Sequence, residues 1–403
     1  MKVLRVTIVA MLVITLLALL MIGVKEEREM SLLQMSESDV KDSINAFSIK
    51  IFSRLNHDEQ NVIFSPFSVF SALAMTYEGA RGETAGEIAN VLCLPSGSPA
   101  EGYRNLSRAL LSNEALKIAN AVWVQTGFPI KEEYLDKISV YYGGTAESID
   151  FAFDPEGARE KINSYVEERT EGKIEDLLPK GSIDPLTKLV ITNAVHFKGT
   201  WKYKFDPSAT FEGDFKTHRG VVKVMMMRMT PEVRLNYSDA GRYEVLELPY
   251  ESKLSTLIFL PKEGEGLNLT PEDLRRAIDS MRGEEFDEVI VPKFEISSDY
   301  DLNGLLISLG MRKAFDQQEA DFTGIYEKEK VSGNLYVSLV KHKAYVKVDE
   351  EGTEAAGATG VVMKLTAVRE RKVFSADRPF IFLILDKETG ALLFIGSLVD
   401  PTA

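Results

Sequence analysis

The sequence predicts a single α+β domain built around large β-sheets. From Lys41 onward the chain has no long linker, internal repeat or low-complexity stretch. Helical periodicity dominates the early part of the chain, and strand-like apolar runs dominate the later part. This order is typical of α+β folds rather than of regular βαβ units. The 403 residues are 45% hydrophobic and 27% charged, which fits one globular body with a sizeable core.

The N-terminal segment is predicted to be separate from this domain. Lys2 and Arg5 precede a mostly apolar run from Val6 to Val24, and charged residues follow it. Such a run is either a secretory signal peptide or a single membrane anchor through residues 6–24. Both alternatives place the protein outside the cytoplasm, secreted or anchored. We therefore expect this segment (1–24), a polar tether (25–40) and a folded domain (41–401).

Four helices are predicted before residue 180. Asp42 to Asn56 places apolar residues three to four positions apart. A second helix starts after Ser65, a favoured N-cap residue, with Pro66 at its first position. Glu83 to Leu94 and Ala158 to Leu178 are the other two predicted helices.

The predicted strands lie mainly in the later part of the chain. Leu189 to Phe197 is a nearly continuous apolar run, which indicates a central strand buried on both faces. Residues 386–390 are typical of a hairpin turn between the last two strands. The other expected strands are Leu116–Val124, Tyr243–Leu248, Ser255–Leu260, Glu288–Ile296, Val337–Val348, Phe380–Leu385 and Leu392–Leu398.

Composition and motifs argue against several functions. The net charge of −14 disfavours nucleic-acid binding, which needs clustered Lys and Arg. The four histidines, His57, His196, His218 and His342, show no metal-ligand spacing, and no common catalytic motif occurs. We therefore expect no enzyme activity, metal or cofactor. The single cysteine, Cys93, excludes an internal disulfide and is predicted to be buried.

One segment near the C-terminus has an unusual pattern. From Thr353 to Thr366, residues alternate so that both charged side chains, Glu354 and Lys364, fall on one face. The other face is small and then apolar. The Gly and Ala content suits strands poorly and is typical of a flexible loop. Two interpretations remain: an ordinary surface loop, or a loop that can also become a strand between existing strands.

This segment closely resembles the hinge of inhibitory serpins. The hinge residues are Gly352, Thr353, Glu354, Ala355, Ala356, Gly357, Ala358 and Thr359. Further stretches that resemble the family are 61–68, 192–201 and 377–382, in the expected order. The resemblance covers the chain from about residue 40 to Pro401, and it is to prokaryote-like members without disulfides. It implies three β-sheets, eight or nine helices and an exposed reactive-centre loop at residues 350–378.

The resemblance also implies a mechanism and a partner. A serine-type protease attacks the loop as a substrate and forms an acyl-enzyme. The cut loop then inserts into the main sheet, with Thr353, Ala355 and Gly357 as its first inward residues, and the covalent complex is trapped. The expected partner is a subtilisin-, elastase- or chymotrypsin-like protease, with a trypsin-like protease as the alternative. We expect a monomer that needs no cofactor and binds no nucleic acid.

Specific residues are implied for opening the sheet. The resemblance implies a hydrogen-bonded cluster beneath the central strands, a tryptophan where the loop enters and a salt bridge at the top of the sheet. These residues are Ser65, Ser68, Asn193, His342, Trp201, Glu350 and Lys293. For His342 the alternative is an ordinary strand histidine between two lysines.

The cut bond is predicted by spacing. The usual spacing in the family, counted forward from the hinge glycine, places the cut bond at Thr366–Ala367. Counting back from the Pro-Phe pair that follows the loop leaves Val368 and Arg369 as alternatives. A bond after Arg369 would suit a trypsin-like acidic pocket, and the others suit small apolar pockets. Two other functions remain open. One is a non-inhibitory serpin that acts as carrier or chaperone, and the other is a tethered protein that binds by sheet-edge addition.

Overall fold

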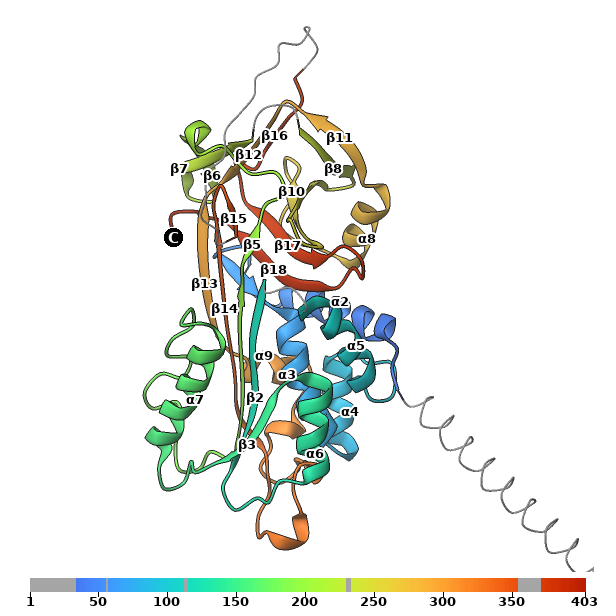
Figure 1. Ribbon diagram of the computed structural model, residues 1–403, viewed down its shortest axis with the longest axis vertical. Helices are drawn as coiled ribbons and strands as arrows, with labels where there is room; N and C mark the ends of the chain where they lie inside the picture. Colours follow the sequence, from blue (N-terminus) through green and yellow to red (C-terminus); the bar gives the residue numbers. More distant parts are fainter. Residues whose placement is uncertain (1–33, 56, 112–114, 230–232, 354–370) are drawn as a thin grey trace, which may run out of the picture.

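The computed structural model describes residues 34–403 except for residues 56, 112–114, 230–232 and 354–370. The described residues form three β-sheets and eight α-helices, which confirms the α+β prediction (Figure 1). The helices are α2 (Glu37–Phe52), α3 (Pro66–Gly79), α4 (Gly82–Val91), α5 (Ala100–Leu111), α6 (Glu132–Lys137), α7 (Pro155–Arg169), α8 (Pro271–Ser280) and α9 (Asn303–Ser308). A π-helical turn, Ile138–Tyr142, continues α6.

Sheet A is the long sheet whose strands run vertically in Figure 1. Its order is β3-β2-β4-β14-β15-β5, and β13 pairs with β14. Strands β4 and β14 are parallel neighbours, and we call the line between them the seam. The strands are β2 (Leu116–Gln125), β3 (Thr145–Ile149), β4 (Leu189–Phe197), β5 (Gly199–Thr200), β13 (Phe294–Asp301), β14 (Val337–Val348) and β15 (Gly352–Thr353).

Sheets B and C form the end of the molecule shown uppermost in Figure 1. Sheet B has the order β1-β18-β17-β10-β9-β8-β11, and sheet C has the order β16-β12-β7-β6. Sheet B contains β1 (Val62–Phe64), β8 (Val233–Ala240), β9 (Tyr243–Pro249), β10 (Leu254–Pro261), β11 (Arg282–Phe286), β17 (Phe380–Asp386) and β18 (Leu392–Leu398). Sheet C contains β6 (Phe211–Thr217), β7 (Gly220–Met229), β12 (Glu288–Pro292) and β16 (Val373–Ser375).

Helix α3 is the central helix of the fold. The Ser65 side chain accepts a hydrogen bond from the Ser68 N–H and caps the helix, and Pro66 occupies its first turn, as predicted. Nearly all of its side chains are buried, because it packs against β2 and β4 of sheet A and against β18 of sheet B. The polar residues at its start therefore lie beneath the centre of sheet A.

Helix α7 covers the opposite face of sheet A. Ile162 and Leu178 pack with Trp123 and Val190 of the sheet in one apolar cluster. The return segment after α7 also reaches the seam, since the Nζ of Lys343 on β14 donates to the Glu175 carbonyl at 3.0 Å. Helix and return segment together lie over the sheet on its outer side (Figure 1).

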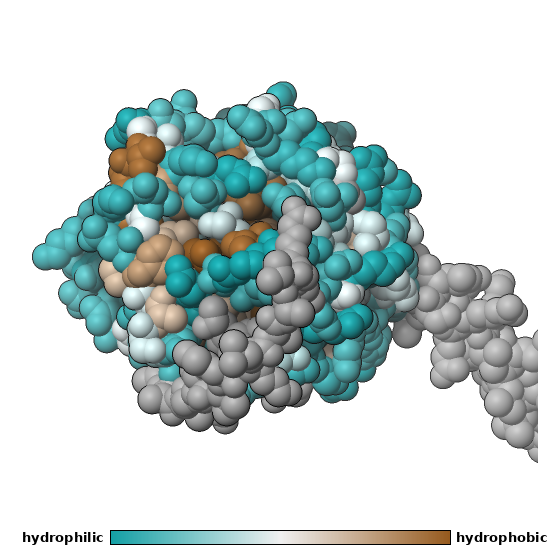
Figure 2. Space-filling view, turned by 90° about the horizontal axis from the view of Figure 1, so that it is seen from above, coloured by the Kyte–Doolittle hydropathy of each residue, from teal (hydrophilic) through white to brown (hydrophobic). Residues whose placement is uncertain are grey.

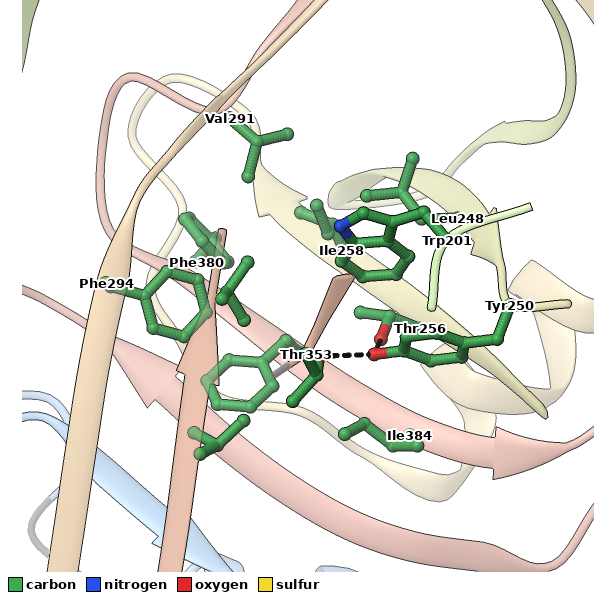
Figure 3. A pocket seen from close by; sticks show the side chains of 13 residues that line it. Trp201, Leu248, Tyr250, Thr256, Ile258, Val291, Phe294, Thr353, Phe380 and Ile384 are labelled. Carbon is green, nitrogen blue, oxygen red and sulfur yellow. Dashed lines mark hydrogen bonds between the residues drawn. The ribbon is translucent and has the colours of Figure 1, made fainter. Parts of the chain in front are cut away.

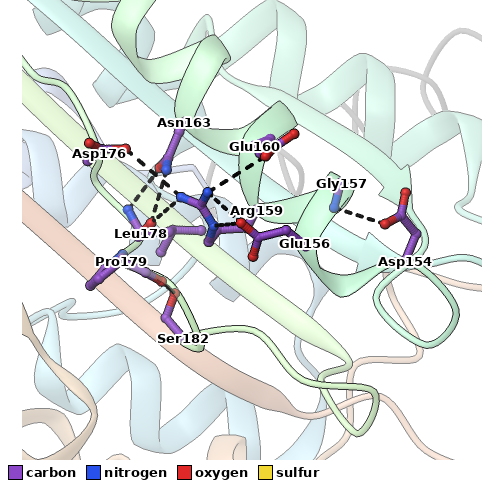
Figure 4. A network of polar contacts seen from close by, with 10 residues as sticks. All are labelled: Asp154, Glu156, Gly157, Arg159, Glu160, Asn163, Asp176, Leu178, Pro179 and Ser182. Atoms are coloured by element: carbon purple, nitrogen blue, oxygen red, sulfur yellow. Dashed lines mark hydrogen bonds and ion pairs between the residues drawn. The ribbon is translucent and has the colours of Figure 1, made fainter.

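The predicted helix from Ala158 to Leu178 is wrong at both ends. The helix starts at Pro155, capped by Asp154, and ends at Arg169. Beyond it the chain turns back, because the Asn163 amide bonds both the N–H and the C=O of Leu178, at 2.8 and 3.0 Å. Arg159 is nearly buried and donates to the same carbonyl at 2.9 Å and to Glu156 at 2.7 Å (Figure 4). These contacts stabilise a turn that periodicity alone does not reveal.

Three further expectations differ from the structure. The first helix begins at Glu37 rather than Asp42, because Ser36 and Asp39 form a capping box within the expected tether. The expected strand Glu288–Ile296 is two strands, β12 and β13, which belong to different sheets. Cys93 is half-buried rather than buried, since it follows the end of α4 with a φ of 58°.

Candidate functional site

The upper end of sheet A already holds the first residues of the hinge. Strand β15 lies between β14 and β5, where Thr353 pairs with Val348 on one side and Gly199 on the other. The Thr353 side chain is fully buried. Its hydroxyl shares a 2.8 Å hydrogen bond with the Tyr250 hydroxyl, which also bonds Thr256 at 2.8 Å (Figure 3). We call this arrangement the hinge seat.

Trp201 forms one wall of the hinge seat. Its ring stacks on Tyr250 with centroids 4.4 Å apart, and its indole N–H donates to the Asp349 carbonyl at 3.0 Å. Its backbone N–H donates to the Glu351 carbonyl at 2.9 Å. The structure therefore places Trp201 against the chain that leads into β15, where the resemblance predicts a tryptophan.

The surroundings of the hinge seat are apolar. A cavity of about 10 Å³, roughly the size that one water needs, lies beside Thr353 (Figure 3). Most of its lining is hydrophobic and comes from all three sheets. These residues include Leu248, Ile258, Val291, Phe294, Val346, Val348, Phe380, Phe382 and Ile384. The hydrogen bonds that link Thr353, Tyr250 and Thr256 are polar contacts within this apolar lining, so they orient the Thr353 side chain.

The predicted ion pair lies above the hinge seat. Lys293 Nζ is 2.8 Å from Glu350 Oε2, and the Thr210 hydroxyl donates to Glu350 Oε1 at 2.8 Å. The Glu350 side chain is 11% exposed and that of Lys293 is 39% exposed, so the carboxylate is the shielded partner. Burial by itself would raise the pKa of Glu350, but the hydrogen bonds from Lys293 and Thr210 outweigh it and lower the pKa.

A polar cluster lies beneath the middle of the seam. The Asn193 side-chain amide donates to the hydroxyl of Ser68 and to the Oδ1 of Asn120. The Ser65 N–H donates to Nε2 of His342 at 3.3 Å, and the Ser65 hydroxyl donates to the Leu393 carbonyl at 2.8 Å. The structure thus brings together Ser65, Ser68, Asn193 and His342, and we call them with Asn120 the seam cluster.

His342 is neutral in this environment. Its ring is fully buried, with the Phe64 ring 4.8 Å away and the Tyr300 ring stacked at 5.9 Å. Burial lowers the pKa of His342 to about 3, and the backbone of Asn193 opposes this shift only partly. His342 and Asn193 face each other across the seam as paired residues.

Sequence reasoning missed four residues of these sites. Asn120 could have been found, because it is a polar residue in the middle of an otherwise apolar strand. No comparable sequence signal marks Tyr250, Thr256 or Thr210. Each of them ends or interrupts a segment whose residue pattern is unremarkable. The hinge from Glu354 to Thr359 and the candidate cut bonds at Thr366, Ala367, Val368 and Arg369 lie outside the described residues.

Some apolar side chains are exposed at the upper end of the molecule. Figure 2 views the molecule from its upper end, where apolar side chains gather near the centre of a mostly hydrophilic face. The exposed large apolar side chains of sheet C are Val221, Met225 and Val373. Met225 adjoins the ion pair, because its carbonyl accepts from the Lys293 N–H at 2.8 Å.

Comparisons with known proteins agree with this architecture. Residues 42–401 match the family model "Serpin (serine protease inhibitor)", and the chain therefore belongs to the serpin family. An uncharacterized serpin-like protein of Thermococcus kodakarensis is 42% identical, over 91% of this chain and 86% of its own. Human Serpin B8 is 36% identical, over 90% of this chain and all of its own.

Solved serpin structures have the same fold. Serpin48 of the insect Tenebrio molitor superposes with a TM-score of 0.78 at 31% identity, covering 91% of this chain and 99% of that one. Human thyroxine-binding globulin, solved in complex with its ligand, gives 0.79 at 29% identity, with the same two coverages. Serpins are generally protease inhibitors rather than enzymes, although some members are non-inhibitory.

The comparisons leave localisation open, because serpins include both secreted and intracellular members. Within the described part of the chain, no helix is long and apolar enough to cross a membrane. The apolar run at residues 6–24 lies outside that part.

We predict that Gly352→Ala destabilises the hinge seat. A Cβ at this position would lie 2.0 Å from the Gly199 carbonyl oxygen, and the φ of +156° is rare for residues with side chains. The backbone of β15 would have to shift and expose Thr353. We expect the free energy of unfolding to fall by roughly 1–3 kcal/mol, which lowers the guanidinium midpoint. We also expect faster proteolysis near residue 352. Gly266→Ala has open space and is the matched control.

We also predict a pH dependence from His342. Its folded pKa is about 3 and its ordinary value is 6.5, so between these values the unfolded chain binds a proton that the folded chain excludes. The free energy of unfolding should therefore fall as pH falls through this window, by at most about 1.4 kcal/mol per unit. Because the folded pKa of Glu350 is lowered, Glu350 adds to the loss of unfolding free energy only as the pH approaches the ordinary pKa of this group, 4.5.

The measurement compares the parent protein with His342→Gln by guanidinium unfolding between about pH 7 and pH 5. We expect the variant to lose part of the pH slope over this range. Equal slopes in both proteins would contradict the assignment of a neutral, buried His342.

Proposed function

We propose that this chain is an inhibitory serpin that acts as a suicide substrate for a serine-type protease. The observation that carries the proposal is the hinge seat. Thr353 is already a buried strand residue between β14 and β5, at the upper end of the seam. Continued insertion would extend an existing strand, and it needs no new site in the sheet.

The residues that follow support this function. From Ala355 to Ala358 the hinge has no side chain larger than a methyl group, so it can enter the seam with little steric cost. Each backbone hydrogen bond that a new strand forms contributes on the order of 1 kcal/mol. A carrier that never inserts its loop has no such requirement, and a bulky or charged hinge would serve it equally well. We therefore favour inhibition over the carrier or chaperone alternative.

The proposed reaction starts as ordinary proteolysis. The protease serine attacks the bond that we place at Thr366–Ala367, and an acyl-enzyme forms with release of the C-terminal side. Insertion then carries the tethered protease along and distorts its active site. Loss of one oxyanion-hole donor slows such chemistry by roughly 100- to 1000-fold, so the ester persists. Insertion must be faster than deacylation, and the hinge sets its rate.

We predict that Thr353→Arg converts the protein from inhibitor to substrate. The hinge seat has no room for a guanidinium, and burying this charge among apolar side chains without a partner is costly. With subtilisin, the parent protein should give a covalent complex that survives denaturing gels, whereas the variant should be cleaved with little complex. Thr353→Ser keeps the hydroxyl to Tyr250 and is the matched control.

The released C-terminal peptide identifies the cut bond. The sequence of this peptide should start at Ala367. If the bond after Val368 or the bond after Arg369 is cut, it should start at the next residue instead. A parent protein that gives no complex with subtilisin, elastase, chymotrypsin or trypsin would overturn inhibition. A Thr353→Arg variant that traps as well as the parent would overturn the role of the hinge seat.

A further inference from the structure

The chain joins sheet C through Arg371 and Lys372, which directly precede β16. Strand β16 is a three-residue edge strand, and its backbone pairs in parallel with β12. So short a parallel pairing holds a strand only weakly. The middle of β16 is anchored by the buried Phe374, so separation of β16 from β12 has to begin at Lys372.

Lys372 is held by both its backbone and its side chain. Its N–H donates to the Asp287 carboxylate at 2.7 Å, and its carbonyl accepts from the Asp287 N–H at 2.9 Å. Its Nζ lies 4.7 Å from the centre of the Tyr237 ring and 5.1 Å from the centre of the Phe286 ring. The same Nζ donates to Glu284 Oε2 at 3.2 Å. We call Lys372 with these four residues the exit clamp.

The exit clamp is built on an edge of sheet B. Tyr237 of β8 and Phe286 of β11 meet edge to face with their ring centres 5.4 Å apart, because β11 pairs with β8. An ammonium group is attracted to the faces of aromatic rings, and a carboxylate strengthens the hydrogen bond that it accepts. Asp287 lies between β11 and β12, so the clamp grips the chain where sheets B and C meet at the upper end of the molecule (Figure 1).

The length of the chain between the two sheets gives this grip a consequence. Thr353 is fixed at the upper end of the seam, and 17 residues separate it from Arg371. Strand β14 has 12 residues. A chain that runs down the whole seam and returns to the upper end therefore needs roughly 24 residues, since each limb rises by the same amount per residue. The uncut chain is too short by roughly seven residues.

The uncut chain could thus fill the seam only if Lys372 and β16 left sheet C. After cleavage the entering strand has a free end, and no return to Lys372 is needed. The exit clamp therefore opposes insertion of the uncut chain and does not oppose insertion of the cut chain.

We infer that Lys372 is a positioning residue that makes insertion conditional on cleavage, with the other residues of the exit clamp as its receptor. The inference rests on the proposed function, and it names the contact that keeps the inhibitor active before it meets a protease. Lys372 touches neither the hinge seat nor the seam cluster, so its effect on the uncut form is separable from theirs.

Lys372→Met tests the inference, because it keeps an unbranched side chain and removes the charge. Tyr237→Leu removes one ring of the receptor and is a second test. Lys372→Arg keeps a positive charge that stacks on aromatic rings and should preserve the clamp. Lys253→Met is the matched control, because it breaks the exposed Lys253–Glu388 pair on another turn of sheet B.

Each uncut protein is incubated at one temperature below its unfolding midpoint. Samples taken over time are mixed with subtilisin, and the covalent complex is measured on denaturing gels. The same samples are unfolded in guanidinium, and mass spectrometry verifies that the chain is still uncut.

We expect Lys372→Met to lose its trapping capacity roughly tenfold faster than the parent, since two cation–π contacts and an ion pair are lost together. The inactive product should be monomeric, uncut and more resistant to guanidinium, because the seam is then filled. Tyr237→Leu should change in the same direction by a smaller factor. Lys372→Arg and Lys253→Met should match the parent, and fresh Lys372→Met should trap as efficiently as the parent.

Two results would overturn the exit clamp and leave the proposed function intact. In the first, Lys372→Met keeps its trapping capacity as long as the parent does. In the second, it loses this capacity through aggregation or with a lower guanidinium midpoint, which is ordinary destabilisation. A parent that never traps subtilisin would overturn the proposed function, and the midpoints of the incubated, uncut variants would still decide the clamp. If those midpoints do not rise either, both are overturned.

Discussion

Burial of Thr353 at the top of sheet A is the constraint on which the rest of the site depends. The side chain lies in an apolar lining drawn from all three sheets, and the Tyr250 hydroxyl supplies its polar partner. Trp201 holds the preceding backbone, and Glu350 is held by Lys293 and Thr210. Gly352 and Thr353 are therefore already paired as a strand between β14 and β5.

Below Thr353 the seam is closed, but not every buried polar group along it has a hydrogen-bond partner. The β4 and β14 backbones pair from Leu189 to His196, which favours the closed sheet. The seam cluster opposes this preference, since the buried Asn193 Oδ1 has no hydrogen-bond partner among the described residues. A buried polar group without a partner costs free energy, so it weakens the closed sheet at this level.

The outer face of sheet A adds a second restraint. The return segment after α7 crosses the seam and is tied to β14 through Lys343, while Arg159 and Asn163 tie it to α7. Apolar contacts also hold the return segment against the sheet, since Ile174 and Leu177 pack with Ala119 and Ala194.

The sequence by itself determined the α+β class, the central strands Leu189–Phe197 and Val337–Val348, and the capped start of α3, because these depend on local periodicity and composition. The hinge motif also pointed to the correct family. Only the tertiary structure decided where α7 ends, why residues 288–296 divide between two sheets, and that Glu350 is shielded. It alone brought Tyr250 to Thr353 and aligned Asn193 with His342, since these partners are 103 and 149 positions apart in the chain and no local pattern encodes their contact.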